Sequence, residues 1–66
     1  MDQNVREQIL SIRNMRLTNM FDLPAVQRLA FERGYYELVF YIEDHKEAYV
    51  HFILTGEESI PESTDN

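Results

Sequence analysis

Residues 35–56 read YYELVFYIEDHKEAYVHFILTG, and the conformation of this stretch decides the fold. Two interpretations compete for it. In the first, apolar and ring side chains recur at spacings of four and three, which places them on one face of a helix. These residues are Leu38, Ile42, His45, Tyr49 and Phe52. In the second, residues 36–42 and 48–54 form a β-hairpin around residues 43–47, because both runs are rich in β-branched and aromatic residues.

The helical interpretation is the one that we adopt. The loop of the alternative hairpin contains no Gly, Pro or Asn, and neither run alternates polar with apolar residues as a half-exposed hairpin should. Residues 43–48 are mostly adequate helix formers. Asp44 and Glu47 have the spacing of a capping box, which predicts that one helix ends and another begins there. Gly56 is expected to end the last helix.

The segment before this stretch carries the signals of a complete helix. Asp22 is a good N-cap, and Pro24 lies in the first turn, where its missing N–H costs nothing. We therefore expect a helix from about Leu23 to Arg33, with Gly34 as a left-handed residue at its end. Its buried face consists of Val26, Leu29 and Ala30.

An amphipathic helix is also predicted near the start of the chain, over residues 3–15. Val5, Ile9 and Ile12 repeat there at helical spacing. Residues 16–22 interrupt the period, and Met20 and Phe21 are expected to hold this connection against the core. The predicted fold is all-α: a compact, helix-turn-helix-like bundle of three to four short helices.

The C-terminal residues 57–66, EESIPESTDN, are polar and acidic. This composition is typical of disordered segments, because it offers little apolar surface to bury. The predicted organisation is therefore one helical domain over residues 1–56, followed by a disordered acidic tail over residues 57–66.

Length, charge and cysteine content restrict the function. The chain has 66 residues, no cysteine and a formal net charge of −6. Residues 1–34 carry five arginines against four carboxylates, whereas residues 35–66 carry one lysine against eight. The acidic half repels nucleic-acid phosphates and attracts basic protein surfaces. A chain this short is only marginally stable alone. Self-association into a homodimer is one way in which it could gain stability.

No pattern in the sequence indicates catalysis, a metal site or a cofactor. Without cysteine there is neither a disulfide framework nor a cysteine-based zinc site. His45 and His51 are six residues apart rather than the four that align two imidazoles on one helical face. We expect His45 to be a packed or interface histidine and His51 to be exposed. No N-terminal segment resembles a signal peptide and no window is apolar enough for a membrane span, so we expect a cytoplasmic protein. Because no catalytic set is recognisable, we expect that it is not an enzyme.

Ala30 and Gly34 are four residues apart and lie among apolar residues, a pattern that is compatible with a helix-turn-helix. A motif that reads DNA also needs basic side chains on its second helix. That helix is expected to begin near Tyr35 or Tyr36, and it carries Glu37, Glu43 and Asp44 instead. We therefore expect a helix-turn-helix-like topology without DNA binding.

Residues 35–47 combine more aromatic side chains than one small core can hold with a run of carboxylates. An exposed aromatic patch beside charged groups suits a protein–protein contact. The alternative is that the aromatic residues fill the core of a single molecule. The predicted contact surface consists of Tyr35, Tyr36, Glu37, Phe40, Glu43, Asp44 and Glu47.

The run from Val5 to Glu57, and above all YYELVFYIEDHKEAYVHFILTGE over residues 35–57, resembles a family of very small uncharacterised proteins, a domain of unknown function. The resemblance implies a phage or prophage of Gram-positive bacteria as the source, and hence a bacterial cytoplasm as the setting. It implies no activity, cofactor or catalytic residue.

Three functional hypotheses remain open from the sequence. The first is a non-enzymatic module that binds a host or phage protein through the acidic and aromatic surface. The second is an acidic mimic of nucleic acid that inhibits a nucleic-acid-binding or defence protein. The third is a dimeric DNA-binding regulator, which would use the five arginines Arg6, Arg13, Arg16, Arg28 and Arg33.

Overall fold

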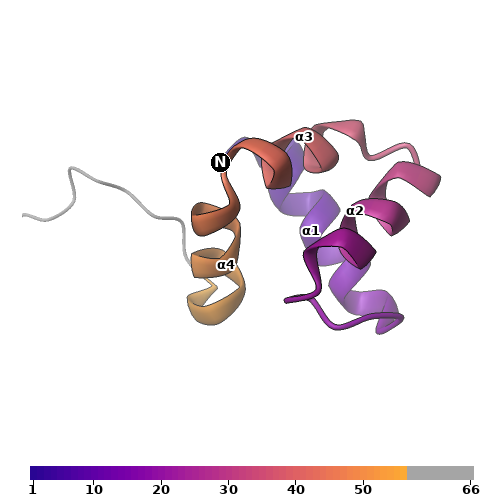
Figure 1. Ribbon diagram of the computed structural model, residues 1–66, viewed down its shortest axis with the longest axis horizontal. Coiled ribbons are helices and arrows are strands. Elements are labelled where there is room, and N and C mark those ends of the chain that lie inside the picture. The colour runs from indigo at the N-terminus through magenta and orange to yellow at the C-terminus, as the bar shows by residue number, and fades with distance from the viewer. Residues whose placement is uncertain (57–66) are drawn as a thin grey trace, which may run out of the picture.

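The computed structural model describes residues 1–56, and this part of the chain consists of four α-helices with no strand (Figure 1). Residues 36–44 and 46–55 are helical, so the adopted interpretation is confirmed and the β-hairpin is wrong. The predicted tail, residues 57–66, lies outside the described residues. The helices are α1 (Gln3–Met15), α2 (Leu23–Glu32), α3 (Tyr36–Asp44) and α4 (Lys46–Thr55).

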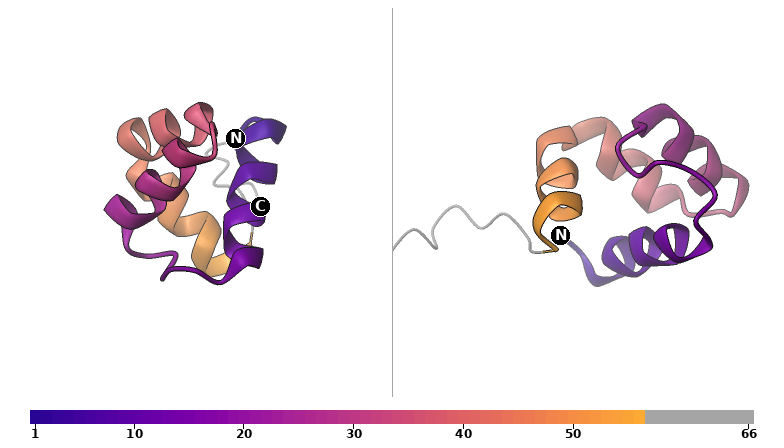
Figure 2. Two further views of the ribbon diagram at one scale, coloured as in Figure 1. Left: turned by 90° about the vertical axis from the view of Figure 1, so that its right-hand side faces the viewer. Right: turned by 90° about the horizontal axis from the view of Figure 1, so that it is seen from below.

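Helix α3 connects the two ends of the molecule. In Figure 1 it crosses the top of the view, with α2 below its right-hand end, α4 below its left-hand end and α1 running behind them. The views in Figure 2 show the four helices around a shared interior. Residues 33–35 alone join α2 to α3, which is the short connection of a helix-turn-helix. The predicted helix-turn-helix-like bundle is therefore confirmed.

One hydrophobic core receives side chains from all four helices and from the α1–α2 connection. The predicted inward faces of α1 and α3 are confirmed, and Leu29 of α2 packs against the core while half-buried. Met20 is buried as expected, whereas Phe21 remains 48% exposed. The core residues are Val5, Ile9, Ile12, Met20, Val26, Ala30, Leu38, Ile42, Tyr49 and Phe52.

The ends of α2 follow the predicted signals. The Asp22 carboxylate accepts a hydrogen bond from the main-chain N–H of Ala25 at 3.3 Å, and Pro24 lies in the first turn. Gly34 has φ +79°, a left-handed conformation that favours glycine. The N–H of Tyr35 then donates to the carbonyl of Ala30 at 2.8 Å, which closes the helix end and turns the chain into α3.

The junction of α3 and α4 differs from the expected capping box, because His45 is both the last cap of α3 and the first cap of α4. Its N–H donates to the carbonyl of Tyr41 at 2.8 Å, and its carbonyl accepts from the N–H of Tyr49 at 3.0 Å. Asp44 stays inside α3, and no side chain caps α4. The break is therefore correctly predicted, but the cap lies one residue later.

Side chains of α1 and α2 hold α3 in place. The Gln8 side-chain oxygen accepts a hydrogen bond from the N–H of Leu38 at 3.1 Å, and this N–H in the first turn of α3 also donates to the carbonyl of Tyr35 at 3.1 Å. From α2, the Gln27 side-chain amide donates to the carbonyl of Val39 at 3.1 Å. Side chains of both preceding helices therefore fix the position of α3.

Candidate functional site

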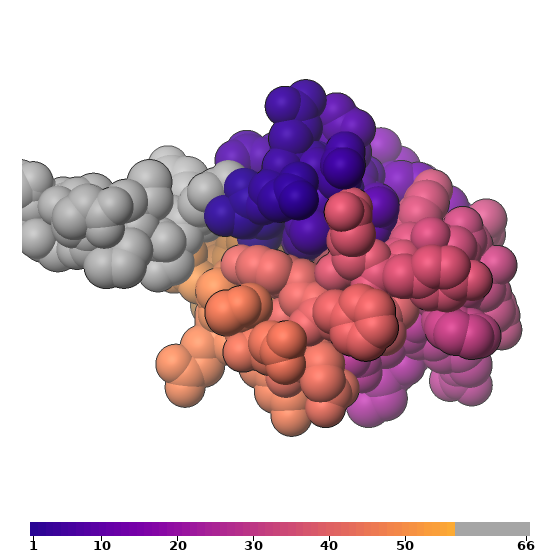
Figure 3. All heavy atoms as spheres, turned by 90° about the horizontal axis from the view of Figure 1, so that it is seen from above, coloured from indigo at the N-terminus to yellow at the C-terminus, as the bar shows by residue number. Residues whose placement is uncertain are grey.

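The outward side of α3 carries exposed aromatic residues. Tyr36 and Phe40 are four residues apart, so they lie on adjacent turns of one helical face. They are 53% and 66% exposed, whereas Leu38 and Ile42 on the opposite side are completely buried. Figure 3 looks onto this outward side, and no other helix crosses it. Helix α3 is thus apolar toward the core and aromatic toward solvent.

Phe31, at the end of α2, extends this aromatic surface. It is 62% exposed, and its ring meets that of Tyr36 edge to face, with 5.5 Å between the ring centroids and 60° between the planes. Such pairs attract beyond the apolar area they bury. The sequence analysis missed Phe31, although its place outside the predicted inward face of α2 indicates an exposed ring. We refer to Phe31, Tyr36 and Phe40 as the aromatic cluster.

Exposed carboxylates share α3 with Tyr36 and Phe40. Glu37, Glu43 and Asp44 are all exposed on α3. One oxygen of Glu43 accepts a hydrogen bond from the Gln27 side-chain amide at 3.2 Å, which ties this carboxylate to α2. Glu47 follows on α4, beyond the break at His45. The structure therefore places most of the predicted surface on α3, with Glu47 on the neighbouring helix.

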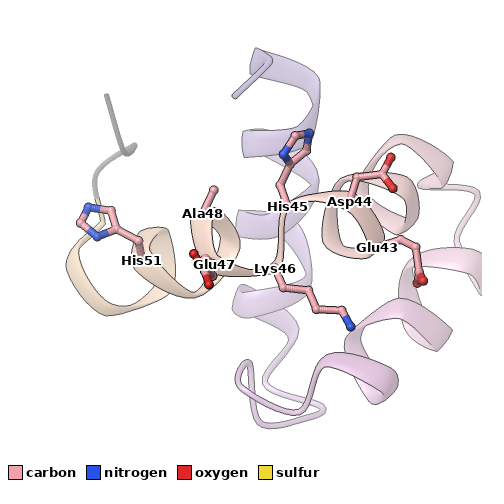
Figure 4. Close-up of a pocket in the computed structure, with 7 residues that line it drawn as sticks. All are labelled: Glu43, Asp44, His45, Lys46, Glu47, Ala48 and His51. Carbon is pink, nitrogen blue, oxygen red and sulfur yellow. The ribbon is translucent and has the colours of Figure 1, made fainter. Parts of the chain in front are cut away.

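An open hollow of about 750 Å³ lies at the α3–α4 junction, lined by residues 43–48 and His51. Figure 4 shows that the side chains of Glu43, Asp44 and Glu47 point away from one another. Within residues 1–56 there is no group of three or more His, Asp or Glu side chains that could hold a metal ion. The arrangement suits long-range attraction of a basic surface better than chelation.

Tyr35 belongs to a different environment from the rest of the predicted surface. Its side chain is half-buried and packs against the core. Its hydroxyl lies 3.0 Å from the hydroxyl of Ser11 on α1, a hydrogen-bonding distance. Tyr35 therefore joins α1 to the start of α3.

The position of His45 corrects the sequence analysis. It was expected on the apolar face beside Ile42 and Tyr49, but it is exposed. The helix break at this residue turns its side chain out of the core, where its ring lies 5.1 Å from that of Tyr41. His51 is exposed, as predicted.

The arginines do not lie along the outward side of α3. Arg13, Arg16, Arg28 and Arg33 are exposed on α1, on α2 and in the connections. The Arg6 guanidinium lies over the Phe52 ring, 5.7 Å from its centroid, so it helps to cover the core. The second helix of the helix-turn-helix-like unit is thus acidic and aromatic on the side that a DNA-reading helix turns toward bases.

Comparison with known proteins gives one match. Residues 1–57 match the family model described as Domain of unknown function (DUF5049). No curated protein and no solved structure matches the chain. None of the described helices is long and apolar enough to cross a membrane.

Proposed function

The chain belongs to the DUF5049 family, a domain of unknown function, and from its surface we propose that it is a non-enzymatic protein-interaction module. The observation that carries the proposal is the aromatic cluster, whose three rings are each more than half exposed. Aromatic side chains dominate the energetics of protein interfaces and are enriched at their centres. Three of them gathered on the surface of so small a domain favour a binding role.

The partner that fits this surface is a protein with an apolar centre and a basic rim. Glu37, Glu43 and Asp44 border the aromatic cluster, and they attract Lys and Arg side chains around the contact. The rings supply the affinity and the carboxylates supply the orientation and the association rate. The proposed binding residues are therefore Phe31, Tyr36, Glu37, Phe40, Glu43 and Asp44, with Glu47 at the edge.

The proposed setting is the cytoplasm of a Gram-positive bacterium, with a phage or prophage as the source of the chain. The resemblance noted over residues 5–57 supports this setting. A small module without an enzymatic site acts there by occupying the surface of a host or phage protein.

The alternative function is an acidic mimic of nucleic acid. It is favoured by the exposed carboxylates Glu37, Glu43, Asp44 and Glu47, which spread over two helices without converging. A mimic binds the basic groove of a nucleic-acid-binding protein, so DNA competes with it and salt weakens its binding steeply. The aromatic cluster in the middle of these charges favours a protein contact with an apolar centre instead.

A matched pair of variants tests the proposed function. Phe40 on α3 and Leu54 on α4 are exposed to nearly the same extent, 66% and 69%. The tagged parent chain, Phe40→Ser and Leu54→Ser are each used to capture proteins from a nuclease-treated Gram-positive lysate. The captured protein is then purified, and its direct binding to the three chains is measured with and without competing DNA.

The proposal predicts that a basic protein binds the parent and Leu54→Ser equally. Its dissociation constant for Phe40→Ser rises by at least about tenfold, as expected for loss of an interface hot spot. Displacement by DNA would favour the nucleic-acid mimic. Equal binding to all three chains would contradict a site on α3.

A further inference from the structure

One side of α1 carries two arginines with a leucine between them. Arg6, Leu10 and Arg13 follow one another at spacings of four and three, so they share a side of the helix. Leu10 is half-buried and packs against the core, whereas Arg13 is exposed. The Arg6 guanidinium lies 5.7 Å from the centroid of the Phe52 ring, which places this side of α1 next to α4. We refer to Arg6, Leu10 and Arg13 as the basic side of α1.

Glu7, the one carboxylate within α1, lies on another side of the helix. It accepts a hydrogen bond from the Gln3 side-chain amide at 3.0 Å. Together with Gln8, Ser11 and Tyr35 it lines an open hollow between α1 and the start of α3. The basic side of α1 therefore has no carboxylate from its own helix to neutralise it.

Residues 57–66 follow α4 directly, and they begin close to the basic side of α1. The N–H of Gly56 donates to the carbonyl of Phe52 at 2.7 Å, so α4 closes one turn beyond the ring that Arg6 covers. Ten extended residues reach at most about 33–36 Å. Helix α1, with 13 residues, is roughly 20 Å long. The segment is therefore long enough to run along the whole of α1.

The sequence of this segment, EESIPESTDN, complements the basic side of α1. It contains four carboxylates, no basic residue and one large aliphatic side chain, that of Ile60. Pro61 disfavours a helical conformation of Ile60. In an extended chain, residues two positions apart point to the same side, so Glu58, Ile60 and Glu62 form an acidic, apolar, acidic row.

The dimensions of the two rows agree. Four extended residues separate Glu58 from Glu62 by about 13 Å. Seven helical residues separate the two arginines on α1 by about 10 Å along the axis. The long arginine side chains cover the difference, so both ion pairs can form while the two apolar side chains meet between them.

We infer that residues 57–66 dock onto the basic side of α1 of the same molecule. Ile60 packs on Leu10, and Glu58 and Glu62 pair with the two arginines. Because the segment belongs to the same chain, its local concentration near α1 is on the order of millimolar, and weak contacts suffice. The docked segment neutralises the basic side and thereby keeps nucleic acids and other polyanions from it. The inference goes beyond the proposed function, since it concerns a surface other than α3.

A spin label on the segment tests the inference in the full chain. The chain contains no cysteine, so Ser63→Cys provides a single attachment site for a nitroxide, which broadens the NMR signals of nearby nuclei. The arginine Nε–H signals and the leucine methyl signals of the basic side of α1 are expected to broaden. The Nε–H signals of Arg28 and Arg33, which are exposed on α2 and at its end, are the controls and are expected to stay sharp.

A matched pair of variants separates the proposed contacts from general attraction. Glu58→Gln with Glu62→Gln removes the two carboxylates that pair with α1. Glu57→Gln with Asp65→Asn removes the same charge from positions outside the row. The broadening is expected to disappear in the first variant and to persist in the second. Equal broadening of all four arginine signals overturns the inference, as does broadening that survives in the first variant or is lost equally in both.

A mixed sample separates docking within one molecule from docking onto a second copy. Isotope-labelled chain without a nitroxide is mixed with unlabelled chain that carries it, and no broadening is expected. Broadening of the basic side of α1 in this mixture overturns docking within the molecule. No partner protein is present in any of these samples, so their outcome is independent of the proposed function.

Discussion

The Tyr49 hydroxyl donates a 2.7 Å hydrogen bond to the main-chain carbonyl of Met20. The bond spans 29 positions of the chain and joins α4 to the connection between α1 and α2. Tyr49 is completely buried, so its ring packs in the core while its polar end satisfies a carbonyl that has no helical partner. This single side chain therefore fixes the last helix against the first half of the molecule.

Tyr49→Phe is expected to destabilise the fold. The ring keeps its packing, but the Met20 carbonyl loses its donor inside the protein, which costs about 1–3 kcal/mol. Urea unfolding followed by circular dichroism measures the change. Tyr36→Phe is the matched control, since Tyr36 is exposed, and its unfolding free energy should match that of the parent. Equal stability of both variants would show that the Tyr49 hydroxyl contributes nothing.

The stability of the fold is expected to fall in alkaline solution. Burial raises the pKa of Tyr49 above its usual value, because ionisation would place a phenolate in the core. The unfolded chain loses this proton at about pH 10, before the folded chain does. Stability from this group is therefore fully present below about pH 10 and is lost above it, by up to ~1.4 kcal/mol per pH unit.

Urea unfolding across this pH range checks the alkaline prediction. The part of the fall in unfolding free energy that is due to Tyr49 should be absent in Tyr49→Phe and present in Tyr36→Phe. The comparison isolates Tyr49 because other groups titrate equally in both variants. The same pH dependence in the two variants would contradict the role of the buried phenol.

Gly34→Ala is expected to destabilise the fold by about 1 kcal/mol, the typical cost of a left-handed conformation for an L-residue. An added Cβ at Gly34 would meet no atom within 4 Å, so the cost comes from the backbone and not from a clash. A chain with D-alanine at this position, made by chemical synthesis, should keep the stability of the parent because D-residues favour positive φ. Equal loss in both chains would indicate a steric cause.

Arg16→Gly is expected to act in the opposite direction. Arg16 caps α1 with φ 57°, and it is a positive-φ residue without the freedom of glycine. Glycine removes that strain, which should raise the free energy of unfolding by about 1 kcal/mol. Glycine also makes the unfolded chain more flexible, and this entropy offsets part of the gain. Thermal unfolding should show a small rise in the melting temperature. A clear fall would mean that the Arg16 side chain contributes more than its conformation costs.

The helices could be predicted from the sequence because their signals are local. Asp22, Gly34 and Gly56 are capping residues whose effect reaches only a few positions along the chain, and each acts as predicted. The core of α3 likewise follows from the spacing of Leu38 and Ile42. Local sequence was sufficient wherever one helix could be considered alone.

The prediction of His45 was wrong because its pattern spans two helices. Leu38 and Ile42 lie on α3, whereas Tyr49 lies on α4. The prediction treated these residues as one continuous helical face and placed His45 on it, but the helix breaks at His45, so the residue belongs to the inward face of neither helix. The bond of Tyr35 to Ser11 could not be predicted either, since the two residues are 24 positions apart and belong to different helices. Surplus aromatic content did predict the exposure of Tyr36 and Phe40, but not the contribution of Phe31 from α2.

Site-specific photo-crosslinking tests the central claim, that the outward side of α3 is a protein-binding surface, most directly. Benzoylphenylalanine is introduced at Phe40 in one chain and at the equally exposed Leu54 in another. Both chains are irradiated in a Gram-positive lysate, and the products are identified by mass spectrometry. Position 40 is predicted to crosslink to a basic protein, and position 54 is predicted not to crosslink to it. The same products from both positions, or none from position 40, would contradict the claim.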